Sequence, residues 1–110
     1  MMRLPMSPAA SGLLRELIRR GRCGRDRILL TELTSNEWQS LTFVGERHRL
    51  LIRITGPDAA SIADLIATGL EEADFNISGQ IVADVRCEDK SQIGPDGSIT
   101  LVIEALTVEE

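Results

Sequence analysis

Residues 38–54 read WQSLTFVGERHRLLIRI, and this stretch decides how the chain is expected to fold. Two runs rich in β-branched and aromatic residues are separated by Gly45 and Glu46, and glycine at the first loop position suits the type II′ turn of a β-hairpin. If these two residues form the turn, Trp38 lies opposite Arg53. The stretch therefore predicts an antiparallel hairpin, whose first strand is expected within residues 27–44 with a bulge or bend near its middle.

Successive side chains of a strand point to opposite faces, so this register divides the hairpin into two sets. The first set is almost entirely aliphatic and is expected to face the core; its members are Leu41, Phe43, His48, Leu50, Ile52 and Ile54. The second set combines an aromatic side chain with hydroxyls and arginines; its members are Trp38, Ser40, Thr42, Arg47, Arg49, Leu51 and Arg53. We expect the second set to face away from the core.

Helices are predicted on both sides of this hairpin, and a second hairpin follows. The first helix is expected from Ser11, as its N-cap, to Gly21. The second is expected over residues 57–75, with Pro57 in its first turn and Gly69 in its interior. The second hairpin turns at IGPDGS, residues 93–98. Its expected core-facing residues are Ile81, Ala83, Val85, Cys87, Ile99, Leu101, Ile103 and Ala105.

The element order is therefore α, β, β, α, β, β. It predicts the α+β class, with a four-stranded, mainly antiparallel sheet and two helices on one face. By topology, this arrangement corresponds to a ferredoxin-like fold or a circularly permuted variant of it. We expect residues 1–10 to form a flexible N-terminus and residues 11–110 to form a single domain.

Composition places the chain among soluble globular proteins, since 43% of its 110 residues are apolar and 26% are charged. No apolar run approaches the roughly 20 residues that span a bilayer, and no signal peptide is recognisable, so a cytoplasmic location and no membrane contact are expected. Cys23 and Cys87 lack any CxxC or Cys/His spacing. They predict neither a metal site nor a structural disulfide.

Charge is distributed unevenly along the chain. Residues 1–27 hold seven arginines against two acids, whereas residues 28–110 hold five cations against fifteen acids. A basic segment of this kind can bind nucleic acid or an anionic membrane, or it can dock on its own acidic domain. We favour docking, and nucleic acid is disfavoured as a partner, because the acidic remainder of the surface would repel a polyanion.

Catalytic patterns are weak, and the sequence predicts a non-enzymatic protein with no catalytic residue and no cofactor. His48 is the only histidine, and no Ser, Cys or carboxylate is spaced to form a recognisable relay with it. Glu71 and Glu72 are adjacent, and adjacent residues diverge on a helix, so they do not form an acid/base pair. Glycine-containing residues 21–25 precede a predicted strand, whereas a phosphate-binding loop opens into a helix.

The outward face of the sheet is the predicted functional surface, because it is too apolar to be left in water without a reason. Its candidate residues are Trp38, Ser40, Thr42, Arg49, Arg53 and Arg86. We expect self-association through this face, as a homodimer that serves as an interaction or regulatory module. The alternative is a site for a small anionic ligand, in which the hydroxyls and arginines bind the anion beside Trp38. Arg49→Ala should weaken subunit association in the first case and abolish ligand stabilisation in the second.

Overall fold

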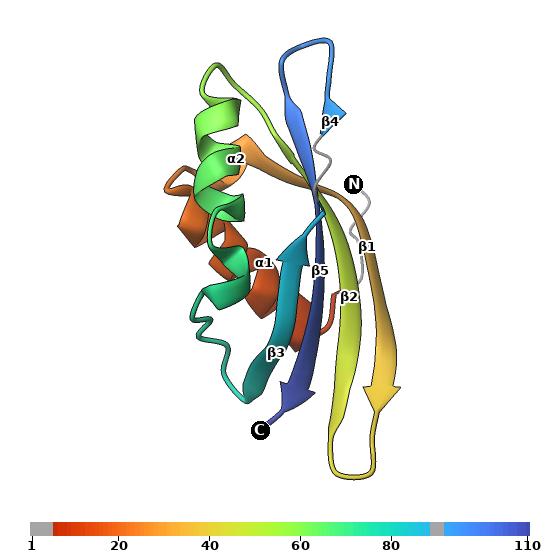
Figure 1. Cartoon of the computed structure of the whole chain (residues 1–110). Coiled ribbons are helices and arrows are strands. Elements are labelled where there is room, and N and C mark those ends of the chain that lie inside the picture. Colours follow the sequence, from red (N-terminus) through yellow and green to blue (C-terminus); the bar gives the residue numbers. More distant parts are fainter. Residues whose placement is uncertain (1–5, 89–91) are drawn as a thin grey trace.

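An antiparallel sheet with two α-helices on one face makes up the computed structural model, which describes residues 6–88 and 92–110 (Figure 1). The strand order is β1-β2-β5-β3, and β4 also pairs with β5. All these pairings are antiparallel. The predicted α+β class and single compact domain are confirmed. The predicted number of strands is wrong, because the described sheet has five.

Helix α1 (Pro8–Gly21) begins four residues earlier than predicted, because its N-cap is Ser7 and not Ser11. Its N-cap is Ser7, whose Oγ accepts a hydrogen bond from the Ala10 N–H at 3.1 Å, and proline in the first turn loses no helical hydrogen bond. The prediction that Ser11 caps the helix is therefore wrong. Residues 8–10, within the segment 1–10 for which a flexible N-terminus is predicted, belong to this helix, and residues 1–5 lie outside the described residues.

Arginines of α1 bond to the domain itself. Arg20 donates from Nε to the Ile66 carbonyl at 3.0 Å and from Nη2 to the Thr68 carbonyl at 2.7 Å. Arg15 donates to the Asn76 carbonyl at 3.1 Å. These contacts support the hypothesis that the basic segment docks on its own domain.

Strands β1 (Ile28–Gln39) and β2 (Val44–Ile54) form the first hairpin, but its turn is not at Gly45 and Glu46. Trp38 pairs with Gly45, and the connecting loop is residues 40–43. The Ser40 Oγ accepts hydrogen bonds from the Phe43 N–H at 3.0 Å and the Thr42 N–H at 3.4 Å. This local bonding favours a turn at the loop and shifts the register.

The shifted register changes which side chains reach the core. His48, Leu50, Ile52 and Ile54 are buried as predicted. Leu41 and Phe43 were predicted to be core residues, and this prediction is wrong. They lie in the loop at the hairpin tip, where Leu41 is fully exposed and Phe43 is 50% exposed.

Helix α2 (Ala59–Ala67) is shorter than the predicted helix. Gly69 follows it with φ of +72°, a left-handed conformation that ends the helix and that glycine adopts without strain. A short 3₁₀ turn, η2 (Leu70–Glu72), comes next. The prediction that Gly69 lies inside the helix is therefore wrong, and a Cβ placed on Gly69 would meet nothing within 4 Å.

Strand β3 (Gln80–Cys87) carries a bulge between Val82 and Asp84 where it pairs with β5 (Ile99–Glu109). A bulge adds one residue and reverses the alternation of side chains. Val82 consequently packs against the core, while Ile81 is 47% exposed and Ala83 is exposed. The predicted core positions of Ile81 and Ala83 are therefore wrong.

Beyond the bulge, the alternation agrees with the prediction. Val85 is buried and Cys87 packs against the core, as do the predicted residues of β5, Ile99, Leu101, Ile103 and Ala105. The additional strand is β4 (Gln92–Ile93), which pairs with the start of β5 across the predicted turn. Only two residues of β4 pair, which explains why sequence periodicity did not reveal this strand.

The core lies between the helices and the sheet and is almost entirely aliphatic. Leu13 and Leu17 of α1, Ile66 of α2, and Leu50 and Ile103 of the central strands are completely buried. At about 1.5–3 kcal/mol for each large side chain removed from water, this burial is the main force that holds the helices on the sheet.

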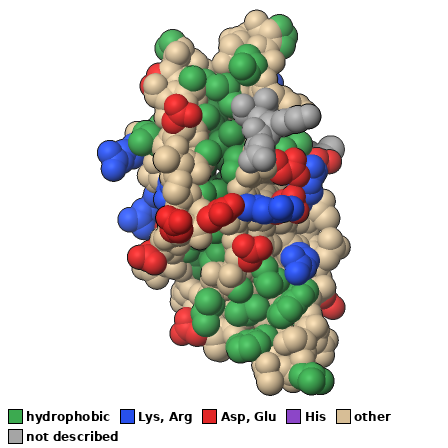
Figure 2. Space-filling model, viewed as in Figure 1, with side chains coloured by type: hydrophobic (Ala, Val, Ile, Leu, Met, Phe, Trp, Pro, Cys, Tyr) green, Lys and Arg blue, Asp and Glu red, His purple; other side chains and the backbone are tan. Residues whose placement is uncertain are grey.

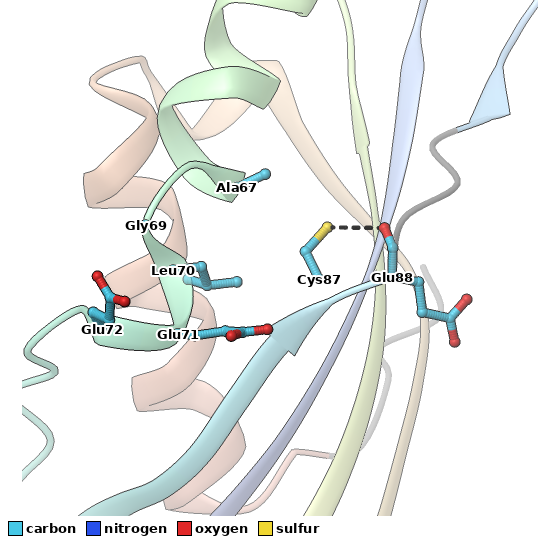
Figure 3. Close-up of a pocket in the computed structure, with 7 residues that line it drawn as sticks. All are labelled: Ala67, Gly69, Leu70, Glu71, Glu72, Cys87 and Glu88. Atoms are coloured by element: carbon cyan, nitrogen blue, oxygen red, sulfur yellow. Dashed lines mark hydrogen bonds between the residues drawn. The ribbon is translucent and has the colours of Figure 1, made fainter.

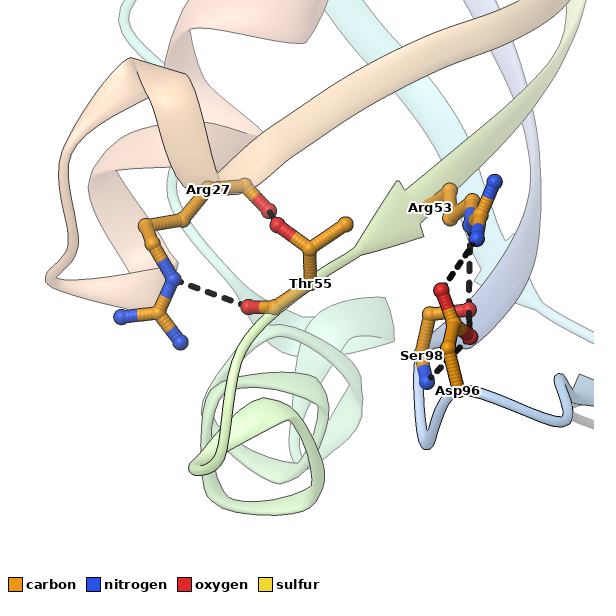
Figure 4. A network of polar contacts seen from close by, with 5 residues as sticks. All are labelled: Arg27, Arg53, Thr55, Asp96 and Ser98. Carbon is orange, nitrogen blue, oxygen red and sulfur yellow. Dashed lines mark hydrogen bonds and ion pairs between the residues drawn. The ribbon is translucent and has the colours of Figure 1, made fainter.

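Polar contacts at the end of β2 join the helical layer to the sheet (Figure 4). Arg27 donates from Nε to the Thr55 carbonyl at 2.8 Å, and its own carbonyl accepts from the Thr55 N–H at 2.9 Å. Arg27 also pairs with Asp58. This ion pair and hydrogen bond hold the pKa of Asp58 below its usual value. The start of β1 is thereby fastened to the turn that leads into α2.

Candidate interaction face of the sheet

The face of the sheet that lies opposite the helices has an apolar end. In one cross-strand row, Trp38 pairs with Gly45, Gly45 with Val108, and Val108 with Ile81. Leu106 lies two residues from Val108 on the same face. Ile81 is 47% exposed, Trp38 and Leu106 are half-buried, and Val108 is largely covered by its neighbours. We call the four side chains Trp38, Ile81, Leu106 and Val108 the apolar end.

Gly45 allows β2 and β5 to approach closely beside this apolar end. A Cβ placed on Gly45 would lie 1.9 Å from the Thr107 carbonyl oxygen and 2.9 Å from the Val108 Cα. Both are backbone atoms, which cannot move aside as a flexible side chain can. Glycine is therefore required at this position by packing, and not by the two-residue turn that the sequence suggested.

Charged side chains form a band across the middle of the same face. Arg49 lies 3.9 Å from Glu32 and 3.6 Å from Glu88, and Arg86 lies 3.3 Å from Glu104. Figure 2 shows charged side chains across the middle of the molecule and hydrophobic side chains gathered below them. Two of the predicted anion-binding arginines therefore already face carboxylates of their own chain.

The third arginine, Arg53, bonds to the turn between β4 and β5 (Figure 4). It donates from Nη2 to Asp96 at 2.6 Å and from Nε to the Ser98 Oγ at 3.0 Å. Hydrogen bonds from the hydroxyl and backbone N–H of Ser98, helped by Arg53, lower the pKa of Asp96 to about 2. This network stabilises the turn, and it gives the Arg53 guanidinium hydrogen-bond partners within its own chain.

The structure does not bring the six predicted site residues together. Trp38 belongs to the apolar end, whereas Ser40 and Thr42 lie in the loop and Arg49 and Arg86 lie in the charged band. Arg53 pairs with Leu29, eight positions along β2 from Gly45, a separation of roughly 26 Å at about 3.3 Å per residue. The prediction that Trp38 lies opposite Arg53 is therefore wrong.

Ile81 and Leu106 complete the apolar end, yet neither was among the six predicted site residues. Leu106 follows Ala105, which the sequence places on the core-facing side, so its outward position could have been found from alternation along β5. Ile81 could not, because the bulge that turns it outward leaves no distinctive residue pattern.

His48 is buried on the opposite, helix-covered face, with 3% exposure. Its Nδ1 lies 2.8 Å from the Ser35 Oγ and its Nε2 lies 2.9 Å from the Thr107 Oγ1. Burial lowers the pKa of His48, so the ring is neutral at neutral pH. Sequence reasoning missed both hydroxyl partners, which come from neighbouring strands. With both ring nitrogens bonded inside the sheet, His48 has a structural role.

A cavity of about 430 Å³ lies between η2 and the end of β3 (Figure 3). Glu71, Glu72 and Glu88 line it, together with Cys87 and Leu70. Figure 3 shows the three carboxylates spread apart and not converging on one point. Within residues 6–88 and 92–110, no three His, Cys, Asp or Glu side chains are grouped as metal ligands.

Comparison with known proteins assigns the chain to no family. No protein-family model matches the chain, and no curated protein matches it in sequence. Among the helices of the described residues, none combines the length and hydropathy needed to cross a membrane.

Proposed function

We propose that this chain is a small non-enzymatic domain that forms a homodimer through the open face of its sheet and acts as an interaction or regulatory module. The observation that carries the proposal is the apolar end, where Ile81 and Trp38 remain accessible on a face that neither helix covers. When a second surface covers such apolar side chains and removes them from water, the complex is stabilised. The proposal includes a cytoplasmic location and a permuted ferredoxin-like topology, which the strand order supports.

Pairing of the arginines favours self-association over binding of a small anion. Arg49, Arg53 and Arg86 each have at least one carboxylate within 4 Å, so an anion would have to displace an existing partner. In a dimer the ion pairs of Arg49 and Arg86 form a polar border beside the apolar end, as is usual at protein interfaces.

Molar mass by light scattering, measured over a range of concentrations, tests the proposal. We expect a dimer of the 12.1 kDa chain, and we expect Ile81→Glu, alone or with Trp38→Ala, to shift the equilibrium to monomer. Leu65→Ser is the matched control, because Leu65 is 42% exposed but lies on α2. A wild type that remains monomeric at every concentration, or a dimer that Ile81→Glu leaves unchanged, would contradict the proposal.

A further inference from the structure

The hairpin tip is a second exposed apolar surface, and it borders the apolar end, because Val44 and Trp38 line the same depression. Leu41 is fully exposed, and Phe43 and Val44 are 50% and 52% exposed. Figure 1 shows the β1–β2 hairpin extending beyond the ends of the neighbouring strands. We call Leu41, Phe43 and Val44 the tip. Because the Ser40 hydroxyl holds the loop through two backbone hydrogen bonds, the tip is ordered before any contact is made.

The surroundings of the tip are acidic. Three carboxylates, those of Glu37, Glu46 and Glu109, line the same depression as Trp38 and Val44. A partner surface that receives the tip should therefore be apolar at its centre and basic at its rim.

A groove on α1 has this character. It has a volume of about 370 Å³ and is lined by Met6, Ser11, Leu14, Arg15, Ile18, Arg19 and Arg25. Three of these lining residues are apolar, three are arginines and none is acidic. The Arg19 side chain keeps 72% of its surface exposed although it pairs with Glu16. The chain as a whole has a net charge of −5, whereas the lining of this groove is basic and apolar.

We infer that the hairpin tip of one copy docks in the α1 groove of a second copy. Leu41 and Phe43 enter between the apolar side chains of the groove, and the carboxylates around the tip face its arginines. Tip and groove are different surfaces of the same chain, so the contact is heterologous and can repeat from copy to copy. It is independent of the proposed sheet-face dimer.

A mixing experiment tests this contact in the 110-residue chain. All samples carry Ile81→Glu, so that the proposed sheet-face contact does not contribute. The tip variant adds Leu41→Ser and Phe43→Ser, and the groove variant adds Met6→Glu and Arg25→Glu, which alter exposed side chains. Ile93→Ser is the matched control for the tip, since Ile93 is 75% exposed but belongs to β4.

Light scattering and sedimentation velocity give the expected result. Each variant alone should stay at 12.1 kDa, because each has lost one of the two surfaces. Their equimolar mixture should form a one-to-one complex of twice that mass, because the groove of one variant and the tip of the other are intact. The Ile93→Ser control should still assemble beyond a dimer. Association should weaken at about 1 M salt, where the Debye length falls to about 3 Å.

Two outcomes would overturn the inference. In the first, the mixture behaves as the sum of two monomers. In the second, the tip variant alone still assembles. Neither outcome bears on the sheet-face dimer, which Ile81→Glu tests by itself in an otherwise wild-type chain.

Discussion

Gly45 is a residue of β2 at which the backbone of β5 leaves no room for a side chain. Its missing Cβ leaves room for the Thr107 carbonyl oxygen, which would lie 1.9 Å from that atom. We predict that Gly45→Ala lowers the free energy of unfolding by at least about 1–3 kcal/mol, the usual cost of forcing extra atoms into a packed site. Urea unfolding followed by far-ultraviolet circular dichroism measures this.

Gly24→Ala is the matched control for Gly45→Ala. A Cβ on Gly24 would meet only the flexible side chain of Asp26, which can rotate away. We expect little change in stability. If both alanine variants lost the same free energy, close approach of the strands would not be the reason for glycine at position 45.

His48 links stability to pH through its burial. Its ordinary pKa of 6.5 applies to the unfolded chain, and the pKa of the folded chain is lower. Between these two values the unfolded state binds more protons, so stability rises with pH in that window. We predict that the free energy of unfolding of the wild type decreases as pH falls below about 6.5, by at most about 1.4 kcal/mol per pH unit.

Comparison with His48→Gln isolates this pH dependence. The variant has no imidazole to titrate, so the part of the pH dependence of unfolding free energy that His48 causes should disappear between pH 7 and the folded pKa. The altered hydrogen bonds of the variant can lower its stability, but by the same amount at every pH. Denaturant titrations at several pH values give both slopes. Parallel curves for wild type and variant would show that His48 does not become harder to protonate on folding.

At the scale of elements, Arg20 connects the two helices. It donates to the Ile66 and Thr68 carbonyls, at the C-terminal end of α2, where a positive charge also favours the helix dipole. We predict that Arg20→Ala costs about 1.5–3 kcal/mol, the range for hydrogen bonds to charged groups. Arg22→Ala should cost much less, because Arg22 is exposed. Equal losses in thermal or urea unfolding would contradict this assignment.

The β4–β5 turn depends on the ionised form of Asp96. The pKa of this carboxyl is about 2 in the folded chain against an ordinary 3.8, mainly because Ser98 donates to it. A lowered pKa of an acid contributes stability that is complete above 3.8 and is lost as pH falls through about 2.

We therefore predict that Asp96→Asn has a lower free energy of unfolding than the wild type at neutral pH. This difference should become smaller in acid. Nuclear magnetic resonance titration of the Asp96 carboxyl, together with unfolding curves from pH 5 to 2, measures both effects. A carboxyl that titrates at its ordinary pKa would show that the turn does not rely on its charge.

At the scale of the whole molecule, the basic N-terminal segment is part of the core. Leu13 and Leu17 are completely buried, and truncating such residues to alanine typically costs about 2–5 kcal/mol each. We predict that deletion of residues 1–27 abolishes cooperative unfolding and sharp proton resonance dispersion. Arg22→Ala with Arg25→Ala keeps α1 while removing exposed charge, and should leave the fold intact. A folded, cooperative domain after the deletion would contradict this prediction.

Much of the architecture could be predicted from residue patterns alone. Helical spacing of Leu13 and Leu17 located α1, and alternation in residues 99–105 located the buried face of β5. Both patterns depend on the local backbone, whose period of 3.6 or 2 residues is independent of the neighbouring element. The class and the layer arrangement therefore followed from the sequence.

The candidate site was harder to predict, because it depends on contacts between distant residues. The sequence predicts Ser40 and Thr42 on the sheet face, but both lie in the loop, where the Ser40 hydroxyl accepts two backbone hydrogen bonds. Trp38 was correctly expected on the outward face, although its partner is Gly45 and not Arg53. The carboxylates that occupy the arginines come from other strands and turns, as with Glu104 beside Arg86.

By itself, the sequence determined an aliphatic core, the order of helices and strands, and an antiparallel sheet with helices on one face. Only the tertiary structure decided the hairpin register, the outward position of Ile81 and the exposure of Leu41. The physical reason is that side chains alternate at a period of exactly two. One extra residue in a bulge reverses which face each side chain meets, and a four-position shift of a turn changes the cross-strand partner of each residue, while the local pattern stays the same.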